Sequence, residues 1–185
     1  MADYVPRLTA PSNSNLYYIK TTHGGYNKCI VINSTTGSVL PNCTGYAWGR
    51  FMECQDNVTD CDLSRGDAGN WYGHNDDYAR GQTPKLGAVI CWEKPGAAGH
   101  VAIVEKIKAN GDITTSNSAY NGRRFFLEDL KASNNYKRGT TYVFQGFIYN
   151  PTDFEHKDSK KSKNNKFKWV LYSRKLRNKQ KFENI

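Results

Sequence analysis

The chain has 185 residues and a formal net charge of +9, and 38% of its residues are hydrophobic and 13% aromatic. A chain with so many aromatic residues can bury a core, so the composition excludes a fully disordered protein. The mean hydropathy is −0.74. No apolar run approaches the roughly 18 residues of a membrane-spanning helix, so we expect none.

The N-terminal residues predict an extended lead-in. Residues 1–15 are polar and contain two prolines. They lack the basic region and apolar stretch of a secretory signal peptide, so we expect a chain made in a reducing compartment. Residues 29–32, Cys-Ile-Val-Ile, form the first predicted strand, which ends at the Asn-Ser-Thr-Thr-Gly run of residues 33–37.

A helix is predicted from Cys43 to about Gln55. Asn42 is a favourable N-cap residue, which places Cys43 in the first helical turn. Apolar residues recur four positions apart along this segment: Ala47, Trp48, Phe51 and Met52. This spacing gives the helix an apolar face that can pack on a second layer.

The rest of the body is predicted to consist of loops and strands. Residues 56–85 are rich in Asp, Asn, Gly and Tyr and predict loops. Strands are predicted at residues 88–92, 100–107, 113–120 and 141–149. The Asn-Gly pair at 110–111 is a hairpin signal between the second and third of these strands. One helix followed by several antiparallel strands predicts an α+β fold.

The last segment carries most of the charge. Residues 155–185 hold 11 Lys and Arg against 3 Asp and Glu, a net +8, whereas residues 1–154 carry only +1. We therefore expect a basic tail that could meet an anionic polymer or a membrane surface, and no nucleic-acid partner for the nearly neutral body. A basic amphipathic helix, a solvated segment and the start of a further domain stay open for this tail.

Five cysteines occur in the chain, at positions 29, 43, 54, 61 and 91. The number is odd, so at least one thiol is unpaired within the chain. No two of them form a C-x-x-C pair, and Asp56, Asp60 and Asp62 are interpreted as turn residues. We expect no metal and no other cofactor. Whether Cys54 and Cys61 form a disulfide stays open.

Cys43 and His100 are the candidate reactive pair. A thiol in the first turn of a helix meets unpaired backbone N–H groups and the positive end of the helix dipole, which should lower its pKa from ~8.5 toward neutrality. His100 follows Gly99 at the start of a predicted strand, where its imidazole could serve as a base. The alternatives are a small buried thiol and a structural histidine. His23, His74 and His156 are weaker candidates.

A third group should orient the imidazole. If even positions of one hairpin strand pair with odd positions of the other, Asn117 lies on the same face as His100. The other register would present Ser116 or Ser118 instead. The hairpin signal does not decide between the two.

Several segments resemble the CHAP domain, the cysteine, histidine-dependent amidohydrolase/peptidase family. Residues 42–50, Asn-Cys-Thr-Gly-Tyr-Ala-Trp-Gly-Arg, resemble its nucleophile helix. Residues 86–92 and 99–105 resemble the central strands of the family. Residues 114–122 resemble the strand that carries the third residue, and residues 145–151 resemble the closing strand. The resemblance covers residues 25–151, within an expected catalytic domain of residues 1–154. Many members have Glu where Asn117 stands. The calcium loop of some phage relatives is not carried over, since residues 33–42 contain no carboxylate.

The resemblance implies a papain-like, NlpC-type fold in which the nucleophile helix packs on an antiparallel sheet. It implies a peptidoglycan hydrolase with Cys43 as nucleophile, His100 as base and Asn117 as the orienting residue. The backbone N–H of Cys43, with Asn42, would form the oxyanion hole. N-acetylmuramoyl-L-alanine amidase and endopeptidase activities both stay open.

It further implies a phage endolysin, a monomer held in the host cytoplasm before release to the cell wall. Four aromatic residues are expected to line the substrate groove, with core packing as the alternative for each: Trp71, Tyr72, Trp92 and Tyr120. Two rival functions are a thiol amidase or peptidase on a soluble substrate and a non-catalytic wall-binding module.

Overall fold

The computed structural model describes residues 2–12, 14–18, 42–57, 61–119 and 125–155. The chain divides into two units, residues 1–154 and 155–185. The strand predicted at 29–32 and the predicted tail helix lie outside the described residues. None of the helices in the described ranges has the length and apolar character needed to cross a bilayer.

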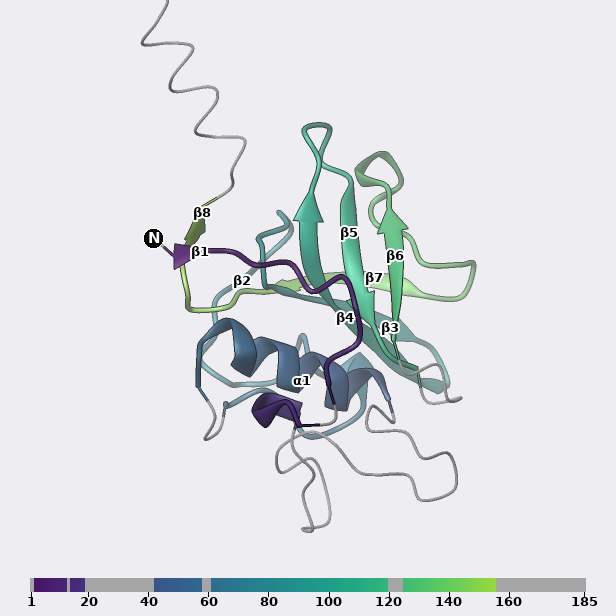
Figure 1. Ribbon diagram of the computed structural model, residues 1–185. Helices are drawn as coiled ribbons and strands as arrows, with labels where there is room; N and C mark the ends of the chain where they lie inside the picture. The colour runs from purple at the N-terminus through teal and green to yellow at the C-terminus, as the bar shows by residue number, and fades with distance from the viewer. Residues whose placement is uncertain (1, 13, 19–41, 58–60, 120–124, 156–185) are drawn as a thin grey trace, which may run out of the picture. The chain divides into compact units, whose positions relative to one another are not determined.

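A six-stranded antiparallel sheet is the centre of the first unit (Figure 1), with the strand order β2-β7-β3-β4-β5-β6. Its strands are β2 (Arg80–Gly81), β3 (Val89–Lys94), β4 (Ala97–Ile107), β5 (Ile113–Asn117), β6 (Phe126–Leu130) and β7 (Val143–Ile148). A two-stranded sheet pairs β1 (Ala2–Asp3) with β8 (Phe154–Glu155). Among the described residues, the helical elements are α1 (Cys43–Cys54) and three 3-10 turns, η1 (Leu16–Tyr18), η2 (Ala68–Asn70) and η3 (Ala132–Asn134). The predicted α+β class is confirmed.

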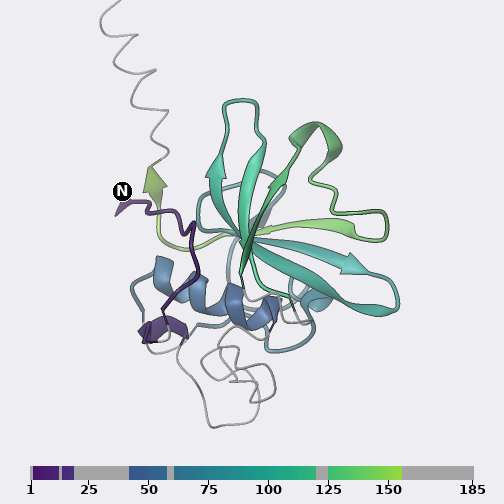
Figure 2. The same cartoon turned by 45° about the vertical axis from the view of Figure 1, so that its right-hand side comes forward.

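Helix α1 begins at the predicted residue because Asn42 caps it. Asn42 has an extended backbone, and its side-chain Oδ1 accepts a hydrogen bond from the Gly45 N–H at 2.8 Å. The helix lies along one face of the sheet (Figure 2). Its aromatic residues pack there with Val101 and Ile103 of β4, whereas Ala102 and Val104 pack in a second cluster on the opposite face.

Two strands of the sheet were not predicted, β2 and β6. Strand β6 alternates half-buried and exposed residues and ends on the buried Leu130, and it contains two acidic residues, so its local sequence is a weak strand signal. Its place at the edge of the sheet comes from pairing with β5, where Thr115 lies opposite Glu128.

A β-bulge at Glu105 sets the register of the β4–β5 hairpin. Close to the turn, Ile107 pairs with Ile113, but beyond the bulge Val104 pairs with Thr115. The additional residue in β4 changes the pairing from odd with odd to even with odd. This is the register in which His100 and Asn117 share a face.

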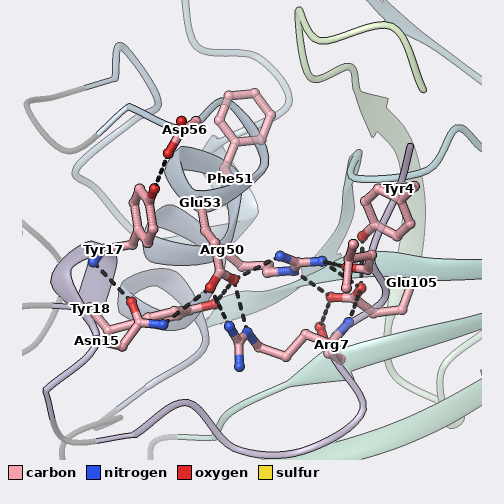
Figure 3. Close-up of polar contacts among 12 residues, drawn as sticks. Tyr4, Arg7, Asn15, Tyr17, Tyr18, Arg50, Phe51, Glu53, Asp56 and Glu105 are labelled. Atoms are coloured by element: carbon pink, nitrogen blue, oxygen red, sulfur yellow. Dashed lines mark hydrogen bonds and ion pairs between the residues drawn. The ribbon is translucent and has the colours of Figure 1, made fainter. Parts of the chain in front are cut away.

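The predicted lead-in packs against α1 and β4 through a buried polar network (Figure 3). The Tyr4 hydroxyl donates to Glu105 Oε2 at 2.7 Å, and the Arg7 backbone N–H donates to the same oxygen at 2.8 Å. Arg50 of α1 donates to Glu105 from Nε at 2.9 Å and also pairs with Glu53. The N-terminal segment therefore joins α1 to β4 rather than lying loosely over them.

Candidate active site

Cys43 lies at the first position of α1 and is half-buried. Backbone N–H groups of Val101, Thr44 and Cys43 itself are directed at its sulfur. The Val101 contact places the thiol beside the first part of β4, next along the chain to His100. The N-cap that the sequence predicted thus places the Cys43 thiol beside β4, the strand that carries His100.

His100 lies in β4 with 5% of its surface exposed. Its ring stands beside the Trp92 ring of β3, with centroids 5.8 Å apart, and beside Tyr142, at 6.3 Å. Gly99 precedes it with a φ of +76°, and a Cβ atom there would come within 2.5 Å of the Gly69 nitrogen. Glycine is therefore required at this position by both its backbone conformation and the close approach of η2.

Asn117, at the end of β5, is fully buried and faces His100. Its Oδ1 lies 2.9 Å from His100 Nε2. Its Nδ2 donates to the Thr115 hydroxyl at 3.0 Å, and that hydroxyl donates to the Glu128 carbonyl oxygen at 3.1 Å. The structure thus brings His100 and Asn117 together and leaves Nδ1 of the imidazole for a second partner.

Within the described ranges, no hydrogen bond joins the Cys43 thiol to the His100 ring. Catalytic hydrogen bonds of this kind are often long or poorly aligned before substrate binds. What the structure assembles is a histidine–asparagine pair and a thiol held by the adjacent backbone.

The electrostatics of the pair differ from the sequence-based expectation. Burial raises the pKa of the Cys43 thiol, and the backbone N–H groups around it only oppose this effect. The predicted low thiol pKa is therefore wrong, because desolvation outweighs the helix terminus. Burial also lowers the pKa of His100 to about 3, with a further lowering by the Arg138 guanidinium. Near neutral pH the pair is a neutral thiol and a neutral imidazole.

Arg138 is a charged residue near the site that the sequence did not single out. Its Nε donates to Glu128 at 2.9 Å, and its guanidinium lies 5.0 Å from the centroid of the Tyr142 ring. Lys94 lies over the same ring at 5.3 Å. A half-buried tyrosine with two cations over it therefore stands next to His100.

The predicted groove residues divide into three groups. Trp71 and Trp92 have no exposed surface, and their ring N–H groups donate to the carbonyl oxygens of Gly66 and Tyr136. They are core residues, so the expectation that they line a groove is corrected. Tyr72 is half-buried and packs against the core cluster that contains the aromatic residues of α1, and Tyr120 lies outside the described residues.

Asn42 and the remaining thiols have defined surroundings. The Asn42 side-chain oxygen accepts from the Gly45 N–H and from the Thr44 hydroxyl, so it acts as a cap. Its role at an oxyanion stays a prediction. Cys54 and Cys91 carry free thiols, which answers the open disulfide question for Cys54. The Asp56 carboxylate accepts from the Tyr17 hydroxyl, and Asp60 lies outside the described residues.

Comparison with known proteins identifies the domain. Residues 33–119 match the family model of the CHAP domain. The chain contains a CHAP domain. The matched range of the CHAP domain includes α1, β3, β4 and β5, and with them Cys43, His100 and Asn117. The network residues Tyr4 and Arg7 precede it.

Solved structures similar to this CHAP-containing chain include a crystal structure of an N-acetylmuramoyl-L-alanine amidase from Staphylococcus aureus. The two share 29% sequence identity with a TM-score of 0.46, over 60% of this chain and 30% of that chain. The present chain thus matches about 30% of the length of that amidase. No curated protein matches the chain.

Proposed function

We propose that this protein is a peptidoglycan hydrolase that cleaves an amide bond of the bacterial cell wall with Cys43, His100 and Asn117. The observation that carries the proposal is the 2.9 Å contact between His100 Nε2 and Asn117 Oδ1, next to a helix that begins at Cys43. A CHAP domain around these residues supports a cysteine- and histidine-dependent hydrolase. This arrangement of nucleophile, base and orienting group is that of a thiol hydrolase.

The first half of the reaction uses the neutral imidazole as a base. His100 Nδ1 takes the thiol proton while Cys43 Sγ attacks the amide carbonyl carbon. The Cys43 backbone N–H stabilises the oxyanion that forms, with Asn42 as a second donor. The imidazolium donates its proton to the amide nitrogen, the C–N bond breaks, and an amine leaves behind a thioester.

The second half uses the same residues in reverse. His100 takes a proton from water, which attacks the thioester carbonyl carbon. The C–S bond breaks, the product leaves as a carboxylic acid and the thiol is regenerated. Burial lowers the pKa of His100 to about 3 in the free protein, so near pH 7 the imidazole is neutral and has a nitrogen that can accept a proton.

The test follows the turbidity of Gram-positive wall suspensions and the release of new amino groups. Wild type should clear walls, and Cys43→Ser and His100→Ala should be inactive while keeping the native circular dichroism spectrum. Cys54→Ala, which removes a free thiol at the other end of the same helix, is the control and should stay active. Activity of Cys43→Ser near wild type would remove Cys43 as the nucleophile.

The bond that is cut and the biological setting are part of the same proposal. An N-acetylmuramoyl-L-alanine amidase would release stem peptides with a free alanine amine, and an endopeptidase would release amines within the stem or cross-bridge. Mass spectrometry of the wall fragments distinguishes them. An endolysin stored in the host cytoplasm should lyse an expressing host only when a pore-forming partner is expressed with it.

A further inference from the structure

We propose that Thr115 is a positioning residue that fixes the protonation tautomer of His100 through Asn117. The proposal deepens the proposed function and rests on it for its catalytic meaning. Its structural content rests on one chain of hydrogen bonds, from β6 through β5 to β4. Each hydrogen bond in this series determines which group donates and which accepts in the next one.

The first step is the Thr115 hydroxyl. It lies 3.1 Å from the Glu128 backbone carbonyl oxygen, and a carbonyl oxygen can only accept. The single hydroxyl proton of Thr115 is therefore committed to Glu128. Thr115 is fully buried, so solvent does not compete for this proton.

The second step is the Asn117 amide. Asn117 Nδ2 lies 3.0 Å from the Thr115 hydroxyl oxygen. Because the hydroxyl proton is already donated to Glu128, the hydroxyl can only accept a hydrogen bond from Asn117. The amide must present its NH₂ group to Thr115 and therefore its oxygen to the other side. Without this hydroxyl the two orientations of a buried amide would differ little in their other contacts on this face.

The third step is the imidazole. Asn117 Oδ1 lies 2.9 Å from His100 Nε2, and an amide oxygen can only accept, so Nε2 carries the proton. Burial keeps the ring neutral near pH 7 by lowering its pKa, which leaves Nδ1 unprotonated. The Glu128 backbone carbonyl, the first acceptor in this series of hydrogen bonds, thus determines that Nδ1 is the basic nitrogen.

The position of Thr115 follows from strand geometry. In β5, Thr115 and Asn117 are two residues apart and lie on the same face, and Thr115 pairs with Glu128 of β6. Thr114 faces the other way, where its hydroxyl donates to the Asp129 carboxylate. These two adjacent threonines therefore give a matched pair for experiment.

The experiment reads the tautomer directly by ¹⁵N NMR of the labelled full chain at pH 7. In wild type, His100 Nδ1 should resonate in the unprotonated range and Nε2 in the protonated range. In Thr115→Val, which keeps the side-chain shape, the amide can turn over, and a substantial fraction of the Nδ1–H tautomer should appear. Thr115→Ser should restore the wild-type spectrum, and Thr114→Val should not change it.

Activity on soluble wall fragments is the second readout. A wrong tautomer in a comparable triad costs about 10⁴-fold in kcat. Partial loss of the correct tautomer in Thr115→Val should lower kcat by about 10- to 100-fold with little change in KM, and Thr115→Ser should recover most of it. Thr114→Val should stay within about twofold of wild type.

The outcomes separate this proposal from the proposed function. A wild-type His100 protonated at Nδ1, or an unchanged tautomer in folded Thr115→Val, would overturn the role of Thr115, whatever the activity. If Thr115→Val does not fold, the wild-type tautomer decides. The expected tautomers in both wild type and Thr115→Val, without any action of wild type on walls, would support the role of Thr115 and refute the hydrolase function.

Discussion

His100 Nε2 and Asn117 Oδ1 lie 2.9 Å apart because β4 contains one additional residue, Glu105. The pairing near the turn, continued without the bulge, would set Asn117 opposite Ile103 and on the face away from His100. The bulge is held by the buried Glu105 carboxylate, which accepts from Arg50 of α1 and from the Ser116 hydroxyl at 2.6 Å. The same carboxylate thus connects the helix of the thiol to the strand of Asn117.

Replacing Asn117 should impair catalysis less than replacing His100. Asn117→Ala removes the acceptor that orients the ring, but some imidazoles still present Nδ1 correctly, so we expect kcat to fall by about 10- to 100-fold. His100→Ala removes the base itself and should leave no measurable turnover. Turnover of soluble wall fragments measures both. His74→Ala is the control, and its inactivation alongside an active His100→Ala would contradict the assignment.

The Cys43 thiol should react with alkylating reagents only at high pH. Because burial raises its pKa, the rate of reaction with iodoacetamide should climb through and above the ordinary thiol range near pH 8.5. A thiolate–imidazolium pair would instead react at a nearly constant rate down to about pH 5. Mass spectrometry of the Cys43 peptide gives the rate, with Cys43→Ser as the background control.

Folding stability should fall between pH 6.5 and pH 3 because of His100. Its pKa is lowered to about 3 by burial, below the ordinary value near 6.5 of an unfolded chain. In this window the unfolded chain binds a proton that the folded chain does not, so stability is complete above pH 6.5 and is lost as the pH falls. The full effect is about 5 kcal/mol. Urea unfolding from pH 7 to 4 should show a shallower loss for His100→Gln, and equal slopes would contradict the buried neutral ring.

Removing the Glu105 carboxylate should strongly destabilise the fold. Glu105→Ala leaves the buried Arg50 guanidinium without its main partner, a change that typically costs about 3–5 kcal/mol. Lys108→Ala, which breaks an exposed ion pair with Asp129, should cost less than about 1 kcal/mol. Urea unfolding measures both free energies. Comparable losses in the two variants would show that the Glu105 network contributes little.

The basic tail should concentrate the enzyme on anionic walls. Residues 155–185 carry +8 of the net charge of +9, so a chain of residues 1–154 should bind intact walls less well at low salt. Screening over a Debye length of ~8 Å at physiological ionic strength should reduce the difference, and at high salt both chains should bind about equally. Cosedimentation with walls measures binding. Both chains should cut soluble fragments, and an insoluble shorter chain would contradict the appendage interpretation.

The sequence by itself determined the local elements of the site. A capping Asn42 followed by an apolar periodicity was enough to place Cys43 at the start of a helix, because caps and helix faces depend on residues a few positions apart. The same holds for the hairpin that carries His100 and Asn117. The resemblance to the CHAP domain then suggested how these elements relate to one another, and residues 33–119 match the model of that family.

Tertiary structure alone decided the register, the protonation of the pair and the use of the aromatic residues. The bulge at Glu105 depends on Arg50, which lies 55 positions away in the chain. Burial by distant elements raises the pKa of the Cys43 thiol and lowers the pKa of the His100 imidazole. Burial by distant elements also leaves Trp71 and Trp92 with no exposed surface. Desolvation and long-range pairing are properties of the packed chain, and a local sequence pattern does not contain them.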